Sequence, residues 1–228
     1  MQKRLFRRLE LEVFLGQIKP HLSPKASLEQ YTIPADVAAT MLYIAAYTRD
    51  DIIGRKVLDP GCGTGRLALG AAFLGAEQAV GVDIDKTAVK LALENSVRTS
   101  LGSKTQWVTA DIDAVYGDFD TVLQNPPFGV QRRGADRKFL EKALENGKVI
   151  YSLHKGQLKD RGLAKGLRAS KTSVTRATPS LFLRNFIEEH GGTIREVHAM
   201  AMTIPHMFNF HTERKHEFTV DLYVIERR

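Results

Sequence analysis

The chain has 228 residues, of which 43% are apolar, and this is enough to bury the core of one ordinary globular domain. Its formal net charge of +7 favours a polyanionic partner. The single cysteine, Cys62, excludes an internal disulfide and a cysteine-based zinc site, and it suits a reducing cytoplasm.

The N-terminus predicts an amphipathic helix that packs on the domain, because Leu5, Leu9 and Val13 are spaced by four residues. Glu10 and Glu12 interrupt the apolar stretch, which argues against a signal peptide. No stretch approaches the length of about 18 apolar residues that a membrane span requires, so we expect no membrane association.

After a proline-punctuated segment at 19–34, helix-like and strand-like patterns alternate. Strands separated by helix-length segments favour a parallel sheet, whereas the short connection between the last two strands favours an antiparallel pair. The predicted fold is therefore α/β, a three-layer Rossmann-like seven-stranded sheet, mostly parallel with an antiparallel C-terminal hairpin. The predicted helices are 35–48, 65–75, 86–100, 136–147 and 179–190, and the predicted strands are 56–60, 79–84, 105–110, 119–124, 148–154, 193–204 and 217–226.

A glycine-rich loop, DPGCGTG at 59–65, follows the first predicted strand. Gly61 and Gly63 let the backbone approach a ligand closely, because they carry no Cβ atom. The loop differs from the dinucleotide fingerprint, since Arg66 stands where the third glycine would be. Ligands of such sheets bind beyond the carboxyl ends of the strands, so we expect a cofactor beside this loop.

Acidic residues at the ends of three successive strands indicate which cofactor binds. Asp59 would repel a pyrophosphate, but it suits the ammonium and sulfonium groups of S-adenosylmethionine. Asp83 is placed to accept both ribose hydroxyls, and Asp111 lies where the adenine would fall. A lone strand-end Asp is more often a helix cap, and we interpret Asp85 as one. The predicted cofactor residues at this rim are Asp59, Gly61, Gly63, Thr64, Asp83 and Asp111.

The fourth strand ends in NPPF at 125–128. Neither Pro126 nor Pro127 can donate to a sheet ladder, so the strand stops at Asn125 and a stiff loop follows. If the side-chain oxygen of Asn125 and the carbonyl of Pro126 accept the hydrogens of an exocyclic amine, they orient it for methyl transfer and stabilise the charge growing on nitrogen. Phe128 then offers a face for the base to stack on. The plainer interpretation is a proline-stiffened turn with a core phenylalanine.

Several motifs together resemble the class I Rossmann-like methyltransferases. More closely, the chain resembles the archaeal and eukaryotic family that methylates N6 of one adenosine in small-subunit ribosomal RNA, to which methyltransferase-like protein five belongs. The motifs that carry this resemblance are LEQY at 28–31, MLY at 41–43, DPGCGTG at 59–65, GVDID at 81–85, NPPFG at 125–129, YSLHK at 151–155 and VDL at 220–222.

The resemblance implies further site residues and a partner. It places Gln30 and Tyr31 in the cofactor site, because LEQY folds over the cofactor in this family. It also implies a small zinc-binding activator protein. We divide the chain into an N-terminal helix and cofactor-covering segment, 1–34, and a methyltransferase domain, 35–228. The basic insertion at 156–176 is longer than in the family and departs from its pattern.

Two segments favour macromolecular partners. The insertion at 156–176 holds six Lys or Arg against one acid, Asp160, so it is either a solvated loop or a grip on RNA phosphates. The strand at 105–110, TQWVTA, lies at the sheet edge in the usual strand order of this fold, has no internal charge and invites a covering partner. Alternatively, the N-terminal helix or Trp107 folded on its own domain shields that edge.

Three evenly spaced histidines, His206, His211 and His216, match neither a helical face nor a zinc pattern. We interpret them as facing solvent or RNA, and we predict no metal site.

Competing functions use the same acceptor motif. A guanine-N2 RNA methyltransferase is the nearest alternative, whereas the basic insertion disfavours a protein-glutamine methyltransferase, and the lack of a target-recognition domain disfavours a DNA adenine methyltransferase. A non-catalytic RNA-binding or ribosome assembly factor is the alternative from another class. The intact motif from Asn125 to Phe128 weighs against it, since a retired enzyme need not keep the acceptor pair.

Overall fold

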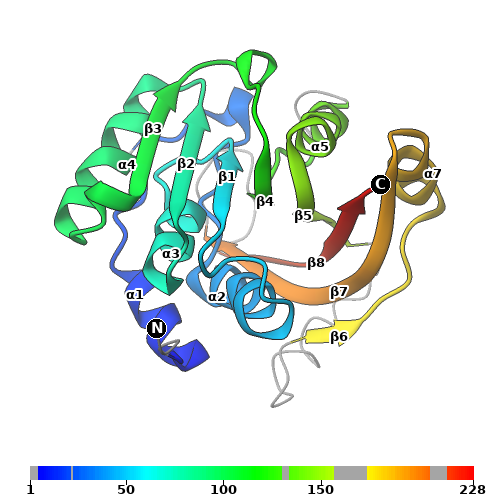
Figure 1. Ribbon diagram of the computed structural model, residues 1–228. Helices are drawn as coiled ribbons and strands as arrows, with labels where there is room; N and C mark the ends of the chain where they lie inside the picture. Colours follow the sequence, from blue (N-terminus) through cyan, green and yellow to red (C-terminus); the bar gives the residue numbers. More distant parts are fainter. Residues whose placement is uncertain (1–4, 22, 130–133, 157–173, 206–214) are drawn as a thin grey trace.

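The computed structural model describes residues 5–21, 23–129, 134–156, 174–205 and 215–228. They form one eight-stranded sheet with the strand order β3-β2-β1-β4-β5-β8-β7-β6, and Figure 1 shows β3 at one edge and β6 at the other. The strands are β1 (Lys56–Pro60), β2 (Gln78–Asp83), β3 (Thr105–Thr109), β4 (Phe119–Gln124), β5 (Gly147–Lys155), β6 (Val174–Arg176), β7 (Gly192–Pro205) and β8 (Lys215–Arg227).

Strand directions confirm the predicted mixed sheet. The first five strands are parallel, while β8, β7 and β6 are joined by antiparallel pairing. The sheet has one strand more than the seven expected. The extra strand, β6, lies in the stretch interpreted as a basic loop, and its three residues are too few for a sequence pattern to reveal.

Helices cover both faces of the sheet (Figure 1). Neighbouring strand residues face opposite cores: Leu123 packs with α1, α2 and α3, whereas Val122 packs with α5 and α7. The predicted helix at 35–48 is confirmed as α2 followed by a π turn, η2. The helices are α1 (Arg8–Gly16), α2 (Ala35–Tyr43), α3 (Arg66–Leu74), α4 (Lys86–Arg98), α5 (Ala135–Asn146) and α7 (Leu181–Glu189), with short turns η1 (Ala26–Leu28), η2 (Ile44–Thr48), η3 (Gly102–Lys104) and η4 (Ile112–Ala114).

The N-terminal helix exists, but the prediction of its buried face was wrong. Leu5, Leu9 and Val13 are 74%, 64% and 58% exposed. Leu11 and Leu15 are buried instead, in the core that α1 shares with α2 and α3. Two apolar stripes therefore run along this helix, and only contact with the rest of the chain decides which one packs inward.

The edge strand β3 has one shielded side chain and an exposed side. The indole of Trp107 fills the space beside Gly65 and Gly81, which confirms the alternative that this ring folds on its own domain. Gln106, Val108 and Thr109 are exposed. Among the described residues, no helix combines the length and apolar character that a membrane span needs.

Candidate active site

A cavity of about 410 Å³ lies at the carboxyl ends of β1, β2 and β4. Its walls come from the glycine loop, the segment before α2, the ends of β2 and β4, and the first turn of α5. All predicted site residues except Pro126 and Phe128 line it, namely Gln30, Tyr31, Asp59, Gly61, Gly63, Thr64, Asp83, Asp111, Asn125 and Pro127. The strand-end rule thus brought together the residues from Asp59 to Asn125, which lie 66 positions apart in sequence.

The glycine loop needs its glycines for geometric reasons. Gly61 has φ +71°, a conformation that favours glycine, and an added Cβ would lie 2.8 Å from Cε1 of Phe139 in α5. Its N–H donates to the carbonyl of Val82 over 2.7 Å, which fixes the loop against β2. Gly63 has φ +53° and open space on its Cβ side. The loop therefore presents bare backbone to the cavity.

Asp59 is a buried carboxyl in the cavity wall, only 2% exposed. Its Oδ2 accepts the N–H of Ala68 over 3.0 Å. Burial raises the pKa of Asp59 to about 8, more than the hydrogen bond lowers it. A cation entering the cavity would reverse this, because it favours the ionised form. The site therefore fits a positively charged ligand group.

Asp83 faces the cavity from the end of β2 with both oxygens fixed. Oδ2 accepts the N–H of Gly63 and Oδ1 accepts that of Asp85, each over 2.8 Å. Burial raises its pKa. A carboxylate can accept about four hydrogen bonds, so two positions remain for ligand hydroxyls. Together with Asp59 and the bare loop, this arrangement fits S-adenosylmethionine.

Asp111 lines the cavity at the end of β3, but part of its carboxylate is already engaged. Oδ1 accepts the N–H of Asp113 over 3.0 Å and lies 3.2 Å from Nζ of Lys138. Lys138 Nζ also lies 2.7 Å from Oδ2 of Asp113, and the hydrogen bonds to Asp113 and Asp111 raise the pKa of Lys138 above its ordinary value. Contact between Asp111 and the cofactor adenine stays a prediction, and Lys138 is an added cavity residue that the sequence pattern did not single out.

The acceptor loop offers an unused hydrogen-bond acceptor. Nδ2 of Asn125 lies 3.5 Å from the carbonyl oxygen of Tyr31, while its buried Oδ1 accepts no hydrogen bond from any described residue. Pro127 lines the cavity and Pro126 is buried beside it. The ring of Phe128 meets Phe218 of β8 edge-on, with centroids 5.9 Å apart, so β8 supports this end of the loop.

A segment at 18–34, which we call the strap, crosses one side of the cavity. Arg66 holds both of its ends, donating to the carbonyl oxygens of Ile18 and Ile33. Asn95 of α4 also brackets Lys19, accepting its N–H over 3.1 Å and donating to its carbonyl over 3.2 Å. Arg66, which stands where the dinucleotide fingerprint has its third glycine, therefore holds the strap across the pocket.

Asp85 caps α4 as predicted, with Oδ1 accepting the N–H of Thr87 over 3.1 Å. It also anchors the middle of the strap, a role that the sequence did not reveal. Oδ2 accepts from Nε2 of Gln30 over 2.9 Å and lies 3.4 Å from Nε2 of His21. Oδ1 lies 3.2 Å from Nζ of Lys25. These hydrogen bonds and the charge of Lys25 hold the pKa of Asp85 below its ordinary value.

A buried polar chain lies behind the acceptor loop. Gln124, the residue before Asn125, donates through Nε2 to Ser152 Oγ over 2.9 Å, and Ser152 lies 2.9 Å from Nε2 of His154. All three side chains are almost fully buried. Burial lowers the pKa of His154 to about 4, so its imidazole is neutral at pH 7. Ser152 and His154 belong to the YSLHK motif, whose structural role is thus to brace β4 against β5.

Comparison with known proteins agrees with this geometry. Residues 37–126 match the family model for ribosomal protein L11 methyltransferase, PrmA. The crystal structure of PH1948 from Pyrococcus horikoshii, provisionally described as an RNA methyltransferase, superposes with a TM-score of 0.80 at 34% identity, covering 98% of this chain and 99% of that one. The fold and the site define a class I S-adenosylmethionine-dependent methyltransferase.

Full-length relatives identify the family. The chain is 36% identical to the rRNA N(6)-adenosine-methyltransferase Mettl5 of Drosophila melanogaster, over 73% of this chain and 83% of that protein. It is 35% identical to the uncharacterized protein MJ0284 of Methanocaldococcus jannaschii, over 98% and 95% of the two chains. The chain belongs to the Mettl5 family of methyltransferases.

Proposed function

We propose that the enzyme transfers a methyl group from S-adenosylmethionine to N6 of an adenosine in small-subunit ribosomal RNA. One observation carries the chemical part: Oδ1 of Asn125 is a buried acceptor in the cavity wall with no described partner. An unsatisfied buried acceptor costs about 1–3 kcal/mol, so its retention calls for a donor that arrives with the substrate. The activity printed for Mettl5 supports adenine as the source of that donor.

The mechanism assigns each group one task. S-adenosylmethionine, when bound, supplies a methyl group activated by its sulfonium. Asn125 Oδ1 and the Pro126 carbonyl accept the two amine hydrogens, which holds the nitrogen lone pair toward the methyl group. The same acceptors stabilise the positive charge that grows on nitrogen, so a strong base is unnecessary. Phe128 supports the base by stacking.

The residues of the cofactor half of the site match the parts of S-adenosylmethionine, which supports methyl transfer as the reaction. Asp59 receives the ammonium end of the cofactor, Asp83 the ribose hydroxyls and Asp111 the adenine. Gln30 and Tyr31 cover the bound molecule from the strap. The match to the L11 methyltransferase model spans residues 37–126, so it covers the cofactor residues from Asp59 to Asp111 and ends at the acceptor pair, before Phe128 and the basic insertion.

The test is to incubate the protein with unmodified small-subunit RNA and labelled cofactor and to map the modified nucleoside by mass spectrometry. N6-methyladenosine supports the proposal. N2-methylguanosine would replace it with the guanine alternative. RNA binding with cofactor bound, but without any transfer, would instead favour an assembly factor.

A small zinc-binding activator is the partner that we propose, docked on β3. This strand is the outer one of the sheet, and Val108 is 43% exposed on it. An unpaired, apolar edge invites strand addition. The N-terminal helix packs with α2 and α3.

Substitution of Val108 tests the activator proposal better than substitution of Trp107, whose ring packs against Gly65 and Gly81. Co-expression with the small zinc protein from the same organism should raise solubility and activity, and Val108→Lys should abolish the gain. Val13→Lys, at an equally apolar exposed position on α1, is the control. Full activity of the isolated monomer, with residues 105–110 protected from hydrogen exchange, would remove the partner and leave the chemistry intact.

The proposal also covers the basic insertion, the division of the chain and the location of the protein. The basic insertion at 156–176 grips RNA phosphates, and most of it lies outside the described residues, as do His206 and His211 and the side chain of His216. Residues 1–34 act as a helix and cover for the methyltransferase domain at 35–228. The free, buried thiol of Cys62 is consistent with a cytoplasmic location.

A further inference from the structure

Helix α7 carries a ladder of three rings at four-residue spacing, Phe182, Phe186 and His190. The centroids of Phe186 and His190 lie 4.1 Å apart with the rings tilted by 25°, and those of Phe182 and Phe186 lie 6.4 Å apart with a tilt of 27°. Leu183 and Ile187 hold the same helix on the core that it shares with α5. The ladder is therefore a rigid surface feature, fixed by the packing of the helix beneath it.

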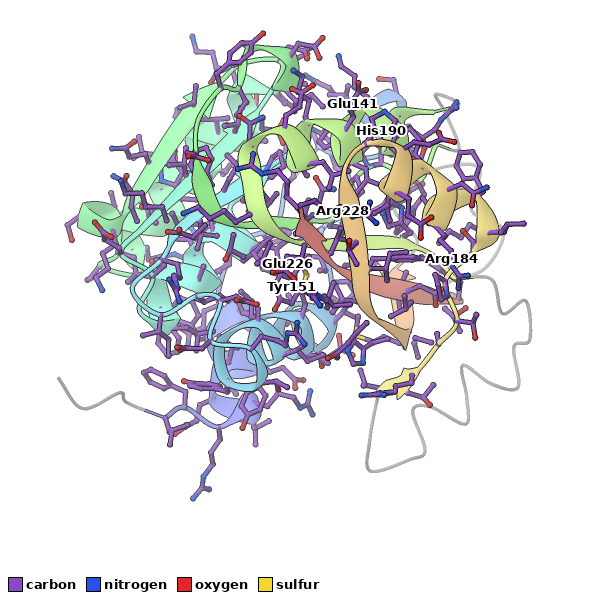
Figure 2. The ribbon with its side chains drawn as sticks, turned by 45° about the vertical axis from the view of Figure 1, so that its right-hand side comes forward. Glu141, Tyr151, Arg184, His190, Glu226 and Arg228 are labelled. Carbon is purple, nitrogen blue, oxygen red and sulfur yellow. The ribbon has the colours of Figure 1, made fainter. Side chains whose placement is uncertain are left out.

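The Phe182 end of the ladder is open. Phe182 is 56% exposed and its neighbour Leu181 is 72% exposed, although large apolar side chains at such exposure are uncommon next to each other. Figure 2 shows α7 with Arg184 and His190 labelled, and Glu141 on the adjoining helix α5. The ring stack thus ends at a side chain that is more than half exposed to solvent.

Arg137 connects this open end to the active-site cavity. Its Cζ lies over the Phe182 ring, 5.8 Å from the centroid. The same guanidinium packs against Gly134, where an added Cβ would lie 2.5 Å from Nη2 of Arg137. Gly134 and Lys138, on either side of Arg137 in sequence, both line the cavity. The guanidinium plane, with the ring beneath it, therefore lies next to residues of the cavity wall, and Arg137 belongs to the helix that follows the acceptor loop in sequence.

We propose that Phe182 and Arg137 form a stacking platform for a nucleobase that flanks the target adenosine in single-stranded RNA. The inference rests on the proposed function and names a substrate contact outside the catalytic cavity. A base has two flat faces, and aromatic rings and guanidinium planes are the surfaces on which proteins stack unpaired bases. A flipped target adenosine leaves its neighbours unstacked, and the platform restores one of those lost stacks.

Charge selects nucleic acid over a protein partner for this surface. Arg137 and Arg184 are exposed on the two helices, and the chain as a whole carries +7. Asp136 also lies in the first turn of α5, but it is half-buried there, whereas Arg137 beside it is exposed. Glu141 lies one turn farther along α5, and Glu188 and Glu189 lie at the far end of α7. The exposed charge nearest to Phe182 is therefore the guanidinium of Arg137, which suits a phosphate backbone.

The first test measures RNA binding without catalysis. A fluorescein-labelled single strand of about 11 nucleotides with one adenosine is titrated with the protein saturated with S-adenosylhomocysteine, and anisotropy is read. Phe182→Ser should weaken binding about 5- to 100-fold, and Phe182→Trp should retain it. Tyr116→Ser is the matched control, because Tyr116 is another exposed ring under a cation, Lys142, away from the cavity. Unchanged affinity for S-adenosylhomocysteine verifies folding.

The second test locates the stacked base. Single abasic sites are placed on either side of the adenosine, and one of them should weaken binding to the wild type but not to Phe182→Ser, since the stack is already lost. Equal sensitivity in both proteins, or wild-type RNA affinity of Phe182→Ser, would overturn the platform. If the wild type yields N6-methyladenosine and Phe182→Ser matches it at every RNA concentration, the platform fails while the proposed function stands. If abasic coupling is present but no adenosine is methylated, the function fails while the platform stands.

Discussion

The side-chain nitrogen of Asn125 lies 3.5 Å from the main-chain oxygen of Tyr31, 94 residues earlier in the chain. This contact links the acceptor loop to the strap and turns the amide so that Oδ1 remains available inside the cavity. The two halves of the site, one for the cofactor and one for the methyl acceptor, thus meet at a single amide. Changes on either side can therefore be separated by measuring binding and transfer independently.

Replacement of Asn125 should abolish transfer while sparing the cofactor. Asn125→Ala removes one of the two amine acceptors, so single-turnover methyl transfer should fall by roughly two orders of magnitude or more. Affinity for S-adenosylhomocysteine, measured by calorimetry, should change less than about threefold, because only a long hydrogen bond to Tyr31 is lost. Near-normal turnover of the variant would rule out the acceptor mechanism.

Asp59→Asn should separate stability from cofactor binding. Because burial raises the pKa of Asp59 to about 8, the folded protein holds a proton that the unfolded chain has released above pH 4. The contribution of Asp59 to wild-type stability therefore falls as pH rises from about 4 to 8. At pH 9 the wild type must bury an ionised carboxylate, whereas the amide of Asp59→Asn is neutral at every pH. The variant should therefore be more stable at pH 9 by at least about 1 kcal/mol, or 2–4 °C in Tm.

The same variant should bind the cofactor about 10- to 100-fold more weakly, since a charge-assisted contact to the ammonium is lost. Calorimetry of S-adenosylhomocysteine at pH 7 in buffers of different ionisation enthalpy should show proton release for the wild type and none for Asp59→Asn. Proton release that persists in the variant would exclude Asp59 as the titrating group.

Arg66→Gln should loosen the strap. The variant loses the guanidinium that joins Ile18 and Ile33, so affinity for S-adenosylhomocysteine should fall about tenfold and tryptic cleavage at Lys19 and Lys25 should accelerate. Arg8→Gln is the control, because Arg8 is an arginine of α1 whose side chain bonds Glu12 within the same helix. Equal cleavage rates in the two variants would argue against a specific role of Arg66.

We expect His154 to change how the free energy of unfolding depends on pH in the acid range. Its pKa of about 4 in the fold lies below the ordinary value of 6.5, so the unfolded chain binds more protons between these values. The contribution of His154 to the unfolding free energy should drop by about 3 kcal/mol as pH falls from 6.5 to 4, and His154→Gln should remove that contribution. The measurement is urea unfolding at a series of pH values. Identical slopes for the two proteins would contradict a buried neutral imidazole.

The rim of the site could be predicted because its residues obey a local rule. Asp59, Asp83, Asp111 and Asn125 each follow an apolar strand, and the parallel sheet then gathers their positions at one edge. The seven predicted strands agree with the structure to within two residues at each end. The periodicity of the strands and the polar residues at their ends were therefore enough to predict most of the fold and the strand-end residues of the site.

Features that depend on distant contacts could not be predicted in this way. Arg66 reaches Ile18 across 48 positions, and Asp85 reaches Gln30 across 55, with no pattern linking the partners. The face of α1 was misassigned because a helix with two apolar stripes gives no local criterion for choosing between them. The ring ladder of α7 followed from its packing beside α5, which the sequence did not specify.

The strap also imposes an order on folding. It precedes β1, yet the residues that hold it are Arg66 in α3, Asp85 at the start of α4 and Asn95 within α4. During synthesis the strap leaves the ribosome before its anchors emerge, so it must remain undocked while two strand–helix units assemble. The cofactor pocket is therefore closed by one of the oldest parts of the nascent chain, and only after α4 has emerged.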